Sequence, residues 1–84
     1  MADLSVQILS PARVVKRTTA RQVQVPGIAG ELGILPGHTA FVTELGEGIL
    51  EVIGTDGGKY KVTGGYLEVI SDNVTILADK IEAS

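Results

Sequence analysis

The side chains with the most chemical potential in this sequence are one histidine and two hydroxyl residues. His38 is the only imidazole of the chain, Thr39 follows it directly, and Ser10 lies far upstream. Acid–base or nucleophilic catalysis needs a base beside a nucleophile, with a third group that orients the base. The spacing of these residues does not indicate such an arrangement. A histidine after Pro36-Gly37 is typical of a turn residue with local hydrogen bonds, so we predict no catalytic residue.

The glycine-rich segments lack a nucleotide-binding pattern. Residues 54–60 (GTDGGKY) place glycine before Lys59, but a phosphate loop needs four residues between its glycines and a hydroxyl residue after the lysine. Residues 27–33 (GIAGELG) space their glycines by three, which is not the dinucleotide pattern, and no βαβ unit surrounds them. We therefore predict turns here and no cofactor.

Lys59 leaves one alternative open. Lipoyl and biotinyl carrier domains are β-sandwiches of similar length that present one lysine at a tight hairpin, and Lys59 lies next to a predicted hairpin. Its neighbours are Gly58 and Tyr60, and not the methionine or Asp-Ala context of those modules. An intact-mass increase at Lys59 after co-expression with a ligase would indicate a carrier.

The composition excludes several other classes of protein. The chain has 84 residues, a net charge of −3, no cysteine and 4% aromatic residues, so we predict one domain over residues 1–84. Without cysteine there is no disulfide, thiolate zinc site or thiol nucleophile, and with one histidine we predict no metal site. The acidic balance argues against nucleic acid. No charged start with an apolar stretch marks a signal peptide, and no apolar run approaches the roughly 20 residues of a membrane span.

The elements that must position these residues are short strands. Valine, isoleucine and threonine are abundant, and turn residues recur every 6 to 12 positions, which favours an all-β sandwich or barrel. We expect no helix beyond a single turn from Asp79. The predicted strands cover residues 4–9, 13–18, 22–25, 31–35, 40–44, 49–53, 59–63, 66–70 and 74–78.

One hairpin has a predicted register. Pairing Leu50 with Val62 and Val52 with Tyr60 puts four apolar side chains on one face. The same register sets Glu51 opposite Lys61 on the other face, which is a favourable cross-strand pair.

Two surface features carry no chemistry of their own. The chain is apolar for its size, which often marks a protein–protein interface. Four basic residues fall within nine positions, and we favour a solvated strand that resists edge aggregation over a patch for an acidic partner. They are Arg13, Lys16, Arg17 and Arg21.

Three segments resemble a known family. Residues 30–38 (GELGILPGH), 64–69 (GGYLEV) and 73–79 (NVTILAD) are similar in order and spacing to the ε subunit of F-type ATP synthase, as are residues 4–10 (LSVQILS) and 23–27 (VQVPG). The resemblance covers that family's N-terminal domain and implies a flattened two-sheet β-sandwich of about ten short strands. It implies a non-catalytic rotor subunit of the central stalk, peripheral to the cytoplasmic face of the bacterial inner membrane. Its partners would be the γ subunit and the c-ring loops, without direct insertion into the membrane.

The resemblance also assigns contact residues. The turn that meets the c-ring corresponds to Gly27, Ile28, Ala29, Gly30 and Glu31, with Glu31 at the family's acidic position. The side that faces γ corresponds to Ser10, His38, Thr39, Phe41 and Val42, and strand alternation must turn either Phe41 or Val42 inward.

Two departures from the family pattern stand out. Ala40 replaces the proline that the family often has two residues after the histidine, and residues 14–20 match loosely. The chain also ends where the family's C-terminal helical hairpin would begin, so we expect no ATP binding and no helix-mediated inhibition for this chain.

Overall fold

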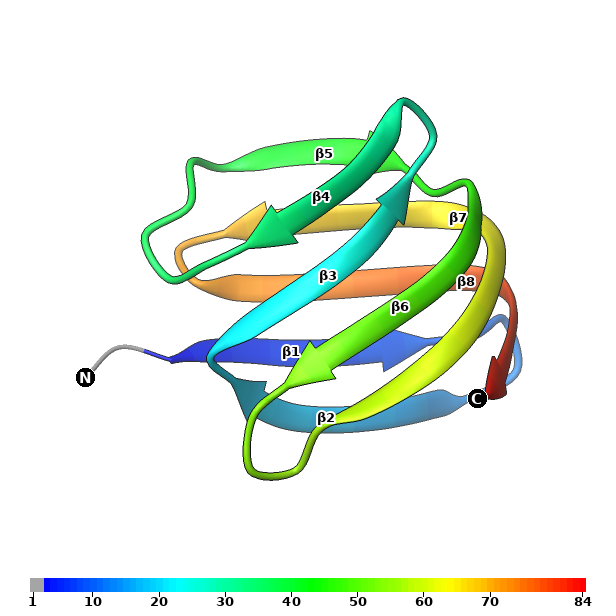
Figure 1. Cartoon of the computed structure of the whole chain (residues 1–84), viewed down its shortest axis with the longest axis horizontal. Coiled ribbons are helices and arrows are strands. Elements are labelled where there is room, and N and C mark those ends of the chain that lie inside the picture. The colour runs from blue at the N-terminus through cyan, green and yellow to red at the C-terminus, as the bar shows by residue number, and fades with distance from the viewer. Residues whose placement is uncertain (1–2) are drawn as a thin grey trace.

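The computed structural model describes residues 3–84, and eight strands account for most of them (Figure 1). Residues 1–2, on which the expectation about a signal peptide partly rests, lie outside the described residues. The strands are β1 (Leu4–Leu9), β2 (Val14–Ala20), β3 (Gln22–Gly27), β4 (Gly30–Ile34), β5 (Phe41–Glu44), β6 (Glu47–Ile53), β7 (Gly58–Ile70) and β8 (Asn73–Ala83).

The strands form two layers that share one hydrogen-bonded network. The order is β2-β1-β8-β7-β6-β3-β4, and β5 pairs with the second half of β7. In Figure 1, β3, β4 and β6 cross in front of β1, β2, β5 and β8, and we call these the front and back layers. The predicted all-β two-sheet sandwich is confirmed. The predicted strand number was too high: two of the nine predicted ranges are halves of β7, which leaves eight strands, and the resemblance implied about ten.

The long β7 strand bends at a glycine pair instead of turning back. Residues 59–63 and 66–70 were predicted as separate strands, but both halves pair with β8. Gly64 and Gly65 have φ values of +71° and +114°, which only glycine adopts without strain. A Cβ on Gly65 would also overlap the carbonyl oxygen of Leu77 and lie 2.9 Å from Ala78 Cα. The bend lets the first half of β7 pair with β6 and the second half with β5.

The predicted helical turn from Asp79 is wrong. Strand β8 continues to Ala83, and its last residues pair with the first half of β7, from Thr63↔Lys80 to Tyr60↔Ala83. Ile81 packs against the core, so burial and the free edge of β7 both favour an extended chain here.

The predicted register of the β6–β7 hairpin was wrong by two residues. Leu50 lies opposite Tyr60, and Glu51 lies opposite Lys59 and not Lys61. A shift of two keeps every side chain on its predicted face, so the apolar pattern cannot distinguish the two registers. The tight turn between the two strands selects the observed register. In this turn Gly57 comes so close to the Val52 carbonyl that no Cβ would fit.

The core lies between the two layers and is entirely hydrophobic. Among the described residues no polar or charged residue is buried. Leu50 comes from the front layer and Ile76 from the back layer, while Val62 and Leu67 come from the two halves of β7, and all four have 0% exposure. Each such side chain contributes about 1.5–3 kcal/mol by burial, which gives the small domain a rigid framework.

Candidate functional site

The residues that raised the question of catalysis do not come together. His38 N–H donates to the Leu35 carbonyl at 3.1 Å, and its ring Nδ1 lies 2.7 Å from the Thr39 carbonyl oxygen. These bonds confirm that His38 is a turn residue. Ser10 directly follows β1, and its hydroxyl donates to the Arg13 carbonyl at 3.3 Å. A base and a nucleophile are therefore not paired here.

The segment predicted to meet the c-ring is the tip of the β3–β4 hairpin. Gly27 pairs with Gly30, and a Cβ on Gly27 would lie 2.8 Å from the Gly30 carbonyl oxygen. Gly30 has a φ of +137° and needs glycine for that reason. Ile28 is 64% exposed, and Ala29 and Glu31 are exposed beside it. The tip therefore presents one large apolar side chain and one carboxylate to the surroundings.

This hairpin tip is held by the segment that joins β5 to β6. Ile28 N–H donates to the Glu44 carbonyl at 3.0 Å, and Gly46 N–H donates to the Pro26 carbonyl at 2.8 Å. A single bridge also joins Gly27 to Leu45. The tip is thus fixed relative to both layers, although it projects from them.

The hairpin tip adjoins β5. A hollow of about 230 Å³ is lined by Gly27, Ala29, Gly30, Glu31 and Leu32 on one side and by Phe41, Val42 and Thr43 on the other. The structure therefore places the predicted c-ring residues next to part of the predicted γ-facing set.

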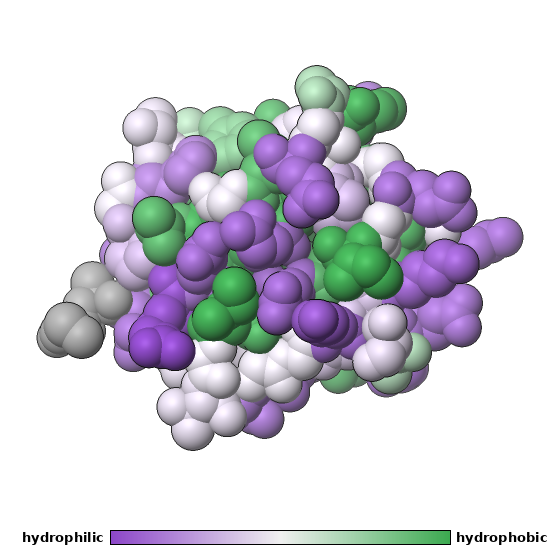
Figure 2. Space-filling model, in the orientation of Figure 1, coloured by the Kyte–Doolittle hydropathy of each residue, from purple (hydrophilic) through white to green (hydrophobic). Residues whose placement is uncertain are grey.

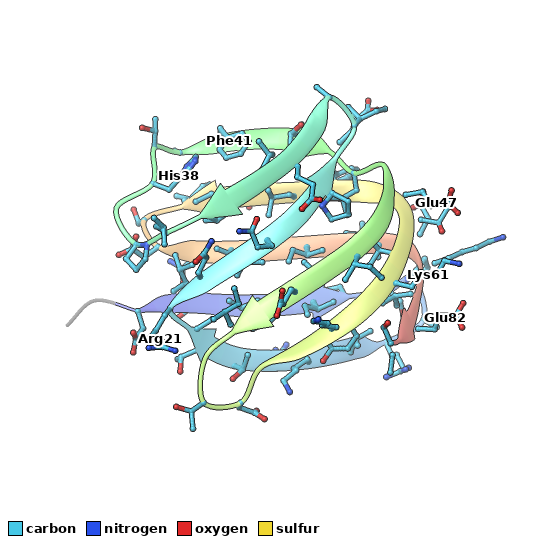
Figure 3. All side chains as sticks on the ribbon, viewed as in Figure 1. Arg21, His38, Phe41, Glu47, Lys61 and Glu82 are labelled. Atoms are coloured by element: carbon cyan, nitrogen blue, oxygen red, sulfur yellow. The ribbon has the colours of Figure 1, made fainter. Side chains whose placement is uncertain are left out.

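The residues predicted to face γ lie in two places. Ser10 follows β1, whereas the other four lie at the start of β5 or in the loop before it. Val42 is 65% exposed, whereas Phe41 packs partly against the core, as strand alternation predicted. The ring of His38 lies against Phe41, with centroids 4.8 Å apart, and both are labelled at one end of β5 in Figure 3. Thr39 is exposed in the loop before β5.

Val42 belongs to a larger apolar patch on the outer face of the back layer. Leu9 pairs with Leu77, and Leu77 pairs with Tyr66, so these side chains form a row across β1, β8 and β7. With Val42 they line a hollow of about 180 Å³, and Glu68 and Thr75 complete its lining. We call Leu9, Val42, Tyr66 and Leu77 the outer patch. The outer face of the back layer is turned away from the viewer in Figure 1.

Sequence reasoning missed three of the four residues of the outer patch. Leu9, Tyr66 and Leu77 alternate with buried neighbours and therefore occupy outward positions of their strands. That alternation was readable in the sequence, but the pairing that gathers them depends on the parallel contact of β1 with β8.

The outer face of the front layer is different in character. Figure 2 shows it as hydrophobic side chains separated by hydrophilic ones. Ile49 is 44% exposed and Leu35 is 54% exposed, but Gln24 and Glu51 pair between their strands. This face offers no continuous apolar surface.

The basic residues of β2 have neighbours within the domain. Lys16 Nζ lies 3.3 Å from Asp56 Oδ1, and Arg17 Nε donates to Gln7 Oε1 at 3.1 Å. Strand β2 has a free edge, and basic side chains along it discourage edge-to-edge pairing. These contacts favour the predicted solvated strand over a patch for an acidic partner.

Lys59 does not lie at the tip of a turn. It is the second residue of β7 and pairs with Glu51, so its position does not favour the carrier alternative. Over residues 3–84 we find no cluster of three potential metal ligands, and no helix that could span a membrane.

The fold and its exposed features define a two-layer β-sandwich whose distinctive surfaces suit protein contacts. The chain belongs to the family described as ATP synthase, Delta/Epsilon chain, beta-sandwich domain, whose model matches residues 3–84. The resemblance inferred from the sequence is confirmed.

Curated relatives agree with this family. The chain is 43% identical over 81 residues to the ATP synthase epsilon chain of Bordetella petrii, covering 94% of this chain and 57% of the relative. It is 42% identical over 82 residues to that of Campylobacter hominis, covering 94% and 63%. The chain thus spans about three fifths of the length of these relatives.

Solved structures show the same fold. A chain in the cryo-EM structure of the Euglena gracilis mitochondrial ATP synthase, OSCP/F1/c-ring, superposes with a TM-score of 0.90 at 24% identity, covering 99% of this chain and 54% of that chain. A chain in the Tetrahymena thermophila mitochondrial ATP synthase central stalk and c-ring gives a TM-score of 0.82 at 16% identity, covering 98% and 67%.

Proposed function

We propose that this chain is a non-catalytic central-stalk subunit of a proton-translocating F-type ATP synthase. It binds the γ subunit and the loops of the c-ring, and it helps to couple rotation of the ring to the catalytic head. It acts at the periphery of the cytoplasmic face of the bacterial inner membrane. Family membership supports the complex, and the outer patch is the observation that carries the contact with γ.

A coupling subunit must transmit torque without deforming. The described residues suit this role, because β7 and β8 link both layers through one hydrogen-bonded network around a hydrophobic core. Close-packed interiors have low compressibility and transmit strain. A load applied at the hairpin tip therefore passes to the outer patch through strands and not through flexible loops.

The outer patch suits a durable protein contact. Its hollow of about 180 Å³ is lined mainly by the four apolar residues of the patch, so it fits one apolar side chain of γ. Desolvated pockets of this kind near the centre of an interface carry much of the binding energy. Ser10, His38 and Thr39 would then contribute polar contacts at the rim of the same interface.

The hairpin tip suits contact with a polar loop. Ile28 and Glu31 are exposed on a tip that backbone hydrogen bonds fix to the sandwich. Glu31 would accept hydrogen bonds from a basic or amide group of a c-ring loop, while Gly27, Ala29 and Gly30 let the backbone approach closely. Because the tip adjoins β5, one molecule can engage both partners at once.

Co-purification with γ tests this proposal. The full chain should co-purify with tagged γ, and Val42→Asp should weaken binding at least tenfold by placing a charge in the outer patch. Ile49→Asp is the matched control, because it puts the same charge at a 44%-exposed position of the front layer and should leave binding unchanged. Wild-type chain that forms no complex with γ at any salt concentration would refute the proposal. Equal loss in both variants would refute the assigned surface.

A further inference from the structure

One side chain ties the loop that carries His38 to the turn between β7 and β8. Asp72 lies in the β7–β8 turn, and its Oδ1 accepts a hydrogen bond from Gly37 N–H at 2.8 Å. The two residues are 35 positions apart in sequence. The Asp72 main-chain carbonyl also accepts from Ser5 N–H at 2.8 Å, so this turn is itself fixed to β1. Asp72 therefore joins the loop to a rigid part of the back layer.

The turn geometry aims the carboxylate. Ser71 and Asp72 have φ values of +48° and +63°, the backbone of a two-residue hairpin turn with both central residues left-handed. Asparagine and aspartate tolerate this conformation better than other non-glycine residues. Ile70 and Asn73 pair on either side, so the direction of the Asp72 side chain is set by the hairpin.

The loop has few other attachments. Residues 35–40 connect β4 to β5, and Leu35, Gly37, Thr39 and Ala40 are exposed. The bonds of His38 to Leu35 and Thr39 are internal to the loop. Within the part of the chain that the structure describes, the bond from Gly37 to Asp72 is the hydrogen bond that joins this loop to another element.

We propose that Asp72 is a positioning residue, which holds residues 35–40 in the conformation that presents His38 and Thr39 to γ. The inference rests on the proposed function. Its physical basis is the population of the binding-competent loop, because apparent affinity falls in proportion to the competent fraction. A charge-assisted hydrogen bond at a partly exposed site shifts such an equilibrium about five- to tenfold.

Two substitutions at position 72 separate the hydrogen bond from the backbone conformation. Asp72→Gly keeps the positive φ without strain but removes the acceptor, whereas Asp72→Asn keeps both an acceptor oxygen and the left-handed backbone. Ser71→Gly is the matched control, because it makes the same change at the neighbouring turn position, whose side chain makes no hydrogen bond to the loop.

Three measurements are made on each full-chain variant: amide hydrogen exchange at Gly37, affinity for γ, and thermal unfolding by circular dichroism. We expect Asp72→Gly to speed exchange at Gly37 about five- to tenfold and to weaken γ binding about three- to tenfold. Asp72→Asn should restore most of both, and Ser71→Gly should change neither. A purely structural role for Asp72 would require the melting temperatures of the three variants to follow the same order as their γ affinities. We expect that they do not.

The possible results are distinct. Faster exchange with weaker binding in Asp72→Gly, rescued by Asp72→Asn, supports the positioning role. If the wild-type chain binds γ, then unchanged exchange at Gly37 or unchanged γ affinity in Asp72→Gly overturns the positioning role and leaves the proposed function standing. A wild-type chain that does not bind γ contradicts the proposed function, and the positioning role falls with it.

Discussion

Replacing Gly65 with alanine tests the bend that places β5 and β6 in different layers. Alanine at a φ of +114° costs on the order of 1–3 kcal/mol in backbone strain. The new Cβ would also lie 2.9 Å from Ala78 Cα and would overlap the Leu77 carbonyl oxygen, so the local β7–β8 pairing must open. One or two backbone hydrogen bonds lost at about 1 kcal/mol each bring the total to roughly 2–5 kcal/mol.

This loss is large for so small a domain. At 0.05–0.15 kcal/mol per residue, 84 residues give a free energy of unfolding of roughly 4–13 kcal/mol. Urea unfolding followed by far-ultraviolet circular dichroism measures the change. Gly30→Ala is the control, because Gly30 has a φ of +137° but nothing lies within 4 Å of a Cβ there, which leaves the strain without the overlap. Gly65→Ala should be about 1–2 kcal/mol less stable than Gly30→Ala, because the lost hydrogen bonds are the part of the cost that the control does not share. Equal stability of the two variants would show that the close approach of β7 to β8 does not constrain the bend.

Three further predictions concern the core, an ion pair and the hairpin tip. Ile76→Ala should lower the free energy of unfolding by about 2–5 kcal/mol, because Ile76 has 0% exposure. Ile28→Ala, at a 64%-exposed position, should change it by less than about 0.5 kcal/mol. Similar costs of the two substitutions in urea titrations would contradict the assigned core. Asp56→Asn should cost less than about 1 kcal/mol, because the Lys16–Asp56 pair is 21% and 72% exposed, and a larger loss in the same titrations would argue for a structural role of the pair. Glu31→Gln should weaken binding to isolated c-ring no more than a few-fold at low salt, and the difference should vanish at high salt as screening removes the ionic contribution; an effect that is independent of salt would exclude an ionic contact.

The sequence was most informative where side-chain alternation decides burial. Leu50, Val52 and Val62 were assigned to one face, and all three are buried. Alternation also required one of Phe41 and Val42 to turn inward, and Phe41 does. The family resemblance supplied the two-layer arrangement, which composition alone left open between a sandwich and a barrel.

Long-range pairing decided the features that were predicted wrongly. The Gly64-Gly65 pair is typical of a loop, yet pairing with β8 on both sides makes it a bend within one strand. The same pairing extends β8 past Asp79, where local sequence indicated a helical turn. The outer patch could not be assembled from sequence either, since Leu9 and Leu77 meet only through the parallel β1–β8 contact.

Site-directed cross-linking to γ tests the central claim most directly. The chain has no cysteine, so a single introduced cysteine is a unique attachment point for a photoreactive maleimide. The account predicts that Val42→Cys and Tyr66→Cys, both in the outer patch, cross-link to γ in the assembled complex. Ile49→Cys, on the front layer, should not. Cross-links to γ from position 49 but from neither position 42 nor position 66 would contradict the assignment of the outer patch as the γ-binding surface.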